Sequence, residues 1–184
     1  MLPSGHLAAG YLTTKLALDS LSKFYPQAND PRFWAMGMVA AIIVDLDSFY
    51  AFFKIGSPIG SSKDINHRKF LSHAPLLHLG IGTLIFGAGR LLHYSDWELY
   101  GILYAVGMAT HFLLDSFGLG LMWLWPFKNE LYAFRRAGKD FETASETVFG
   151  YWRDFLKDYI RDFVFYLEAA VILSAILAKI FWKT

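Results

Sequence analysis

Long apolar runs restrict this chain more than any other feature of its sequence. Residues 33–53, 70–92, 99–125 and 163–182 form four runs of roughly the length, ~20 residues of helix, that crosses a bilayer. A shorter apolar stretch, Gly5 to Phe24, stops before Pro26 and could pack on the bundle, re-enter or span. Only 18% of the residues are charged, below the quarter or so that is usual in soluble domains. These features predict an all-α fold, a polytopic transmembrane helical bundle of four to five membrane helices in a single domain over residues 1–184. Its first partner is then the lipid bilayer.

The segment 128–162 is the one sizeable extramembrane stretch that the pattern predicts. Its second half places apolar residues at helical spacing, with charged residues on the opposite face. This is typical of an amphipathic helix, which next to a bilayer either lies in the interface or caps the bundle by packing on protein. We expect the segment to be cytoplasmic or interfacial.

The distribution of Lys and Arg predicts the orientation of the bundle. If the runs cross alternately, the loop 54–69 and the segment 128–162 share one face, which then holds eleven of these residues against five on the other. The positive-inside rule places the richer face in the cytoplasm. We therefore expect a multi-pass membrane protein with this face in the cytoplasm; the resemblance described below implies that the membrane is the inner one.

Composition limits the partners and the chemistry. A net charge of +1 gives no reason to expect nucleic acid as a partner. The chain has no cysteine, so any metal must be bound by imidazole and carboxylate groups. Several glycines in the second run, Gly80, Gly82, Gly87 and Gly89, are expected to allow close packing between helices.

Ionisable side chains within the apolar runs are the candidate functional residues, because burying them in a membrane is costly. His111 and Asp115 lie four residues apart, on one helical face. The predicted topology brings these and other His and Asp residues to one membrane level near the cytoplasmic face. The converging residues are His6, Asp45, Asp47, His67, His73, His111 and Asp115.

Three carboxylates at this level would repel one another unless cations neutralise them. Mixed imidazole and carboxylate ligands favour Zn²⁺, Mn²⁺ or Fe²⁺ over Ca²⁺ or Mg²⁺, and seven ligands favour two metals over one. We expect a divalent metal in one to two or more copies; the preference for zinc comes from the resemblance described next. Asp45 and Asp47 are also candidate proton acceptors, and Arg68 is a candidate for binding a substrate oxyanion or, equally, a positive-inside anchor.

The same residues carry a resemblance to a known family. His6 with Gly10-Tyr11, the VDLD of Val44 to Asp47, the NHR…SH of Asn66 to His73, and HFLLDS followed by WPF resemble the YdjM-like family of LexA-regulated, inner-membrane, metal-dependent hydrolases. The resemblance covers residues 5 to about 128. It implies distant similarity to zinc phospholipase C and P1 nuclease, with a polynuclear zinc site and phosphoester cleavage. The chain departs from the pattern in having Val44 where proline is usual. Its His6 also lies five residues in, whereas the soluble zinc enzymes use their N-terminal amine as a ligand.

These features favour a membrane-bound metal-dependent hydrolase that cleaves a phosphoester in a lipid or amphiphilic substrate with metal-activated water. One alternative is a metal or proton transporter that uses the same His and Asp residues. Another is a structural membrane protein in which His111 and Asp115 merely join two helices. His78, His93 and Glu168 are expected to play structural roles, Glu168 by pairing with a hydroxyl group of a neighbouring helix.

Overall fold

The computed structural model describes residues 1–47, 50, 61–62, 65–118, 120–135 and 148–182. Within them the regular elements are helices, apart from a two-residue antiparallel pairing of β1 (Ser61–Ser62) with β2 (Ile65–Asn66) and an isolated bridge between Leu121 and Tyr132. The α-helices are α1 (Pro3–Leu21), α2 (Pro31–Ala40), α4 (Pro75–Leu92), α5 (Ser95–Asp115), α6 (Val148–Tyr159) and α7 (Phe163–Phe181). Short 3-10 turns are η1 (Pro26–Asn29), η2 (Ile43–Leu46), η3 (His67–Lys69) and η4 (Leu71–His73).

Local sequence explains where four of these helices begin. Pro3, Pro31 and Pro75 each occupy the first turn of a helix, where a missing N–H costs nothing. Asp30 and Asp162 cap α2 and α7 by accepting a hydrogen bond from the backbone N–H two residues on.

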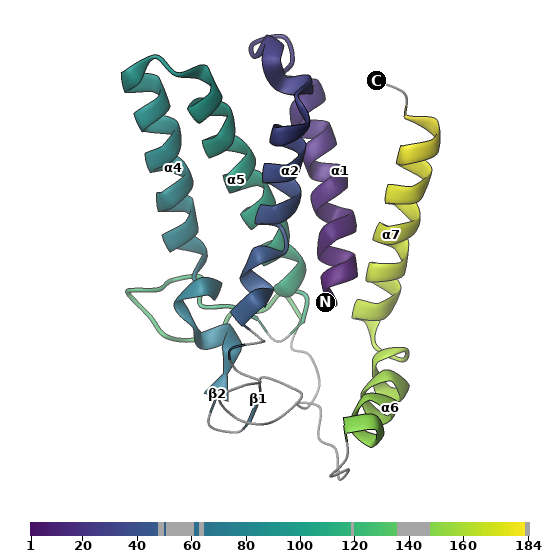
Figure 1. The fold of residues 1–184 in the computed structure, drawn as a ribbon. Coiled ribbons are helices and arrows are strands. Elements are labelled where there is room, and N and C mark those ends of the chain that lie inside the picture. Colours follow the sequence, from purple (N-terminus) through teal and green to yellow (C-terminus); the bar gives the residue numbers. More distant parts are fainter. Residues whose placement is uncertain (48–49, 51–60, 63–64, 119, 136–147, 183–184) are drawn as a thin grey trace.

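Five of these helices form an elongated bundle (Figure 1). Helix α5 packs against α1, α2 and α4, while α7 packs on α1. One buried apolar cluster joins α1, η1, α2 and α5 through Leu18, Ala28, Phe33, Leu99 and Leu103. A second cluster, Ala40, Val44, Met108, Phe112 and Leu121, lies around the ends of α2 and α5. This second cluster holds α2 and α5 together beside the polar site described below.

Glycine allows the closest helix contacts. A Cβ on Gly89 would lie 2.5 Å from the backbone nitrogen of Glu98, and one on Gly82 would lie 3.1 Å from the Cβ of Ala105. Gly80 and Gly87 have no such neighbour within 4 Å, so only two of the four glycines expected at an interface lie in one.

The membrane prediction is confirmed in part. Among the described residues, α4 and α7 are the helices long and apolar enough to cross a membrane. Their outer surfaces are apolar, with Leu84 74% and Phe181 74% exposed. The expectation of four to five such helices is therefore wrong by this measure, since two are found.

Two of the predicted spans end earlier than expected, and α2, with ten residues, is too short to cross a membrane. Helix α2 ends at Ala40 instead of continuing to residue 53, and the chain continues as the η2 turn. Helix α5 ends at Asp115, ten residues before the predicted end, and Gly120 follows with φ +87°. Helix α4 begins at Pro75 and not at residue 70, because a proline fits the first turn of a helix and not its interior.

Candidate metal centre

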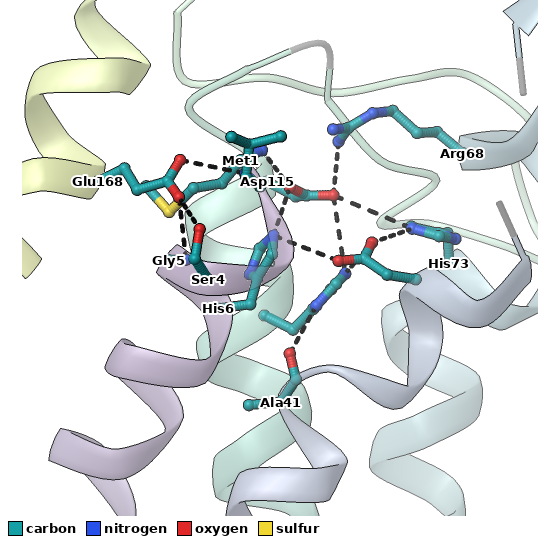
Figure 2. Close-up of polar contacts among 12 residues, drawn as sticks. Met1, Ser4, Gly5, His6, Ala41, Arg68, His73, Asp115 and Glu168 are labelled. Carbon is teal, nitrogen blue, oxygen red and sulfur yellow. Dashed lines mark hydrogen bonds and ion pairs between the residues drawn. The ribbon is translucent and has the colours of Figure 1, made fainter. Parts of the chain in front are cut away.

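The polar site lies at the end of the bundle where the N-terminus is found (Figure 1). The first turn of α1 contributes His6, and η2 after α2 contributes Asp45. The last two turns of α5 contribute His111 and Asp115. Segments that are far apart in the sequence thus deliver imidazole and carboxylate groups to one place, as Figure 2 shows.

Four of these side chains form a compact donor group, which we call the His2Asp2 group: His6, Asp45, His111 and Asp115. One ligand atom from each lies within 4.8 Å of all the others. His6 Nε2 is 3.2 Å from Asp115 Oδ1, and His111 Nε2 is 3.7 Å from both Asp45 Oδ1 and Asp115 Oδ2. His6 and His111 are fully buried, whereas the side chain of Asp45 is 16% exposed.

A backbone carbonyl fixes the orientation of His111. Its Nδ1 lies 2.9 Å from the carbonyl oxygen of Ala41, which can only accept, so Nδ1 must donate the hydrogen. In the neutral ring the lone pair is then on Nε2, which points toward the two carboxylates. Such a contact is a common way to orient a metal-binding histidine. It also satisfies a carbonyl at the C-terminal end of α2, where intrahelical partners are lacking.

His73 and Asp47 form a pair beside the His2Asp2 group. His73 Nδ1 is 2.8 Å from Asp47 Oδ2, and the Ser72 hydroxyl donates to the same oxygen. His73 Nε2 lies 4.0 Å from Asp45 Oδ1 and from Asp115 Oδ2. Asp47 therefore contacts the group through His73, in the arrangement of a carboxylate that orients a metal-binding imidazole.

Two positive charges contact Asp115. Arg68 donates from Nη1 to Oδ2 over 2.7 Å, and the Met1 ammonium group lies 3.2 Å from Oδ1. Burial would raise the pKa of the Asp115 carboxyl, but Arg68 and the Met1 ammonium outweigh it and hold the pKa well below its usual range. Burial raises the pKa of Asp45, an effect that the nearby His6 opposes.

The donor set fits a divalent metal. Asp45 Oδ2 and His111 Nε2 are buried and have no hydrogen-bond partner among the described residues, which is costly unless something else binds them. Two imidazoles with two carboxylates suit Zn²⁺, Mn²⁺ or Fe²⁺. The geometry thus supports the coarse expectation of a His/Asp group able to hold a metal.

The structure brings six of the seven predicted ligands close together, four of them within one group and two beside it. Four form the His2Asp2 group, and His73 with Asp47 stands at its edge. The backbone of His67 lies in η3, but its side chain is outside the described residues. Arg68 is buried against Asp115, which does not fit an exposed interfacial anchor.

The other histidines have structural surroundings. His78 contacts the Tyr104 hydroxyl at 2.6 Å and the Ser72 carbonyl at 2.9 Å. His93 caps α4 in a left-handed conformation, with φ 58°. Neither belongs to the His2Asp2 group.

Glu168 has more contacts than its sequence context suggests. Its buried carboxylate accepts hydrogen bonds from Leu2 N, Gly5 N and the Ser4 hydroxyl, and Tyr159 donates to it as well. The expected hydroxyl partner is thus present, but the larger effect is to cap the N-terminus of α1, the helix that carries His6. The Met1 amine, which no sequence pattern indicated as part of the site, lies 3.2 Å from Asp115, next to the turn that Glu168 caps (Figure 2).

Comparisons with known proteins show to which family the chain belongs. No curated protein and no solved structure matches this chain. A family model, described as YdjM inner membrane protein, matches residues 1–184. This match extends the resemblance into the last third of the chain, where no motif had indicated it. The chain belongs to the YdjM inner membrane protein family.

Proposed function

We propose that the chain is a membrane-bound metal-dependent hydrolase that cleaves a phosphoester in a lipid or amphiphilic substrate. The observation that supports this most is the His2Asp2 group, whose ligand atoms converge within 4.8 Å at one end of a membrane bundle. A purely structural polar pair needs neither four such groups nor buried atoms without hydrogen-bond partners.

His6, His111 and Asp115 would hold the metal, with Asp45 completing the set and His73 close enough to join it. A divalent ion bound there, zinc by preference, supplies Lewis acidity toward a phosphoryl oxygen and lowers the pKa of water. Asp45 is the most exposed of the four carboxylate and imidazole side chains, and its Oδ2 has no hydrogen-bond partner among the described residues. We assign it the transfer of a proton from the attacking water.

Arg68 would contribute a positive charge to the site. It lies against Asp115 and is almost fully buried, so its positive charge is poorly screened by water. Because this charge offsets the Asp115 carboxylate, the carboxylates of the site would repel an anionic substrate such as a phosphoester less. Asp47 would act through His73 by holding that imidazole in one orientation.

The placement of the site favours an amphiphilic substrate on the cytoplasmic side. The site lies at one end of a bundle in which α4 and α7 are candidate spans. Lys and Arg are concentrated in the segments predicted for that end, which the positive-inside rule places in the cytoplasm. A multi-pass protein of this orientation would meet lipid headgroups at the site.

A cation transporter is the alternative, and Lys15 weighs against it. Lys15 lies nine residues, about two and a half turns, beyond His6 along α1, is 2% exposed and pairs with Asp19 at 3.4 Å. A buried ammonium inside the bundle would repel a cation that passed from the site toward the opposite end.

Hydrolysis by purified protein in detergent or liposomes tests the proposal. Asp45→Asn keeps the shape of the side chain but removes its charge, and should lower the metal-dependent rate by at least ~100-fold if Asp45 is the general base. Asp96→Asn makes the same change at the opposite end of the bundle, where Asp96 pairs with Arg32, and should leave the rate unchanged.

The hydrolase proposal fails if fully metallated protein leaves a broad panel of phosphoesters, amides and carboxyl esters intact. Metal uptake into liposomes would then be the assay for the alternative.

A further inference from the structure

Helix α6 exposes an apolar stripe at the site end of the molecule. Phe149 is 82% exposed, Leu156 48% and Ile160 48%. Trp152 is 42% exposed. Helical spacing of three and four residues places these side chains on one face. The stripe consists of Phe149, Trp152, Leu156 and Ile160.

Charged residues are sorted by sign around the rest of α6. Arg153, Lys157 and the following Arg161 recur every four residues, so they form a basic row along the helix. Each basic residue follows an apolar stripe residue directly, which places the row at the border of the stripe. Asp154 and Asp158 each follow a basic residue and so lie about 100° further around the helix axis, on the side away from the stripe. Arg153 reaches across to Asp154 at 2.8 Å.

Contacts between Tyr159 and α7 hold the end of α6 next to the start of α7. The Tyr159 hydroxyl donates to Glu168, and the Tyr159 ring meets Phe165 with 5.8 Å between centroids. Asp162 then caps α7, which is a candidate span. In Figure 1, α6 lies beyond the end of α7 and turns off its axis. The apolar stripe therefore adjoins the exposed residues that begin the span, including Phe163 and Tyr166.

We propose that α6 docks in the interface of an anionic bilayer leaflet. The apolar stripe inserts below the headgroups, the basic row lies at the level of the lipid phosphates, and Asp154 and Asp158 face water. This order of apolar, basic and acidic rows is complementary to an anionic lipid surface, where each Lys or Arg near the surface strengthens binding. Because α7 already borders the bilayer, lipid is the occupant next to the stripe. The proposal does not depend on the metal centre.

Fluorescent labelling of the full-length chain in proteoliposomes tests the docking. The chain has no cysteine, so a single Cys carries an environment-sensitive NBD probe at Leu156, in the stripe, or at Asp158, on the opposite side. Vesicles contain phosphatidylcholine alone or with phosphatidylglycerol, and a lipid with a shallow nitroxide serves as the quencher. We expect the Leu156 probe to shift to the blue and be quenched by the nitroxide lipid, and the Asp158 probe to do neither.

Charge removal tests the lipid class. In vesicles with phosphatidylglycerol, the variant Arg153→Gln/Lys157→Gln/Arg161→Gln should weaken docking by about fivefold for each charge removed. In phosphatidylcholine alone it should have little effect. Lys157→Gln alone is the milder version if the triple variant does not assemble.

Three results would overturn the proposal. A Leu156 probe that shifts to the blue without quenching by the nitroxide lipid would mean that protein, such as a second copy of the chain, covers the stripe. Equal quenching at Leu156 and Asp158 would contradict the orientation. Docking that is the same in both kinds of vesicle would contradict the preference for anionic lipid.

Discussion

A single methyl group at Gly107 should disturb both the bundle and the metal centre. A Cβ there would lie 2.5 Å from the carbonyl oxygen of Gly37 and 2.7 Å from the Cβ of Ala40. Both neighbours belong to α2, and a backbone carbonyl cannot move aside alone. Gly107→Ala must therefore push α2 away from α5. Gly87→Ala is the matched control, because a Cβ at that helical position has no neighbour within 4 Å.

The effect of each variant on stability has two contributions, helix propensity and overpacking. Replacing a helical Gly by Ala gains about 1 kcal/mol of stability from helix propensity in either case. Overpacking at Gly107 costs about 1–3 kcal/mol, whereas Gly87 incurs no such cost. We expect Gly107→Ala to be less stable than Gly87→Ala by that 1–3 kcal/mol. Reversible unfolding in detergent by titration with SDS measures the difference.

Metal affinity provides a second measurement on the same variants. Gly107 lies one turn before His111, and the Ala41 carbonyl that orients His111 follows the displaced part of α2. Loss of such an orienting contact typically costs ~10–100-fold in metal affinity. Competition with a chelating dye should show this loss in Gly107→Ala and not in Gly87→Ala. Equal stabilities and equal affinities in the two variants would refute the packing of α2 on α5 described here.

Three further experiments test separate features of the structure. Asp47→Asn should lower metal affinity by about 10–100-fold, because Asp47 holds His73 in its orientation. The same dye competition measures this affinity, and an unchanged value would contradict that role. Glu168→Gln should lower the stability measured by the SDS titration by about 1.5–3 kcal/mol, because it weakens charge-assisted hydrogen bonds to the start of α1. The same change at the exposed Glu130 should lower it little, and equal effects would contradict the role of Glu168 as a cap. A membrane-impermeant maleimide should label Asn129→Cys only from the cytoplasmic side and Ser95→Cys only from the opposite side, and the reverse pattern would invert the orientation.

Hydropathy and periodicity predicted the elements whose own sequence determines them. The apolar run 163–182 became α7 almost to the residue, and the amphipathic pattern from residue 148 became α6. The convergence of His6, Asp45, His111 and Asp115 also followed from the sequence, because alternating helices return to the same end of a bundle.

Tertiary contacts decided the features that sequence reasoning missed. The apolar run through Ala41 contains no proline to stop α2 at Ala40, and the carbonyl released there is bound by His111, seventy residues away. Asp47 looked like a further ligand because of its position beside Asp45, but it pairs with His73. Glu168 looked isolated because its partners Leu2, Ser4 and Gly5 lie at the other end of the sequence.

The metal content of the purified full-length chain, measured by elemental mass spectrometry, tests the central claim most directly. We predict at least one transition metal per chain, with zinc the first expectation, and its loss in His111→Ala. His78→Ala, which removes a histidine bonded to Tyr104 and Ser72 instead of the His2Asp2 group, should keep the metal. Protein that binds no metal, or binds it equally in both variants, would contradict the account.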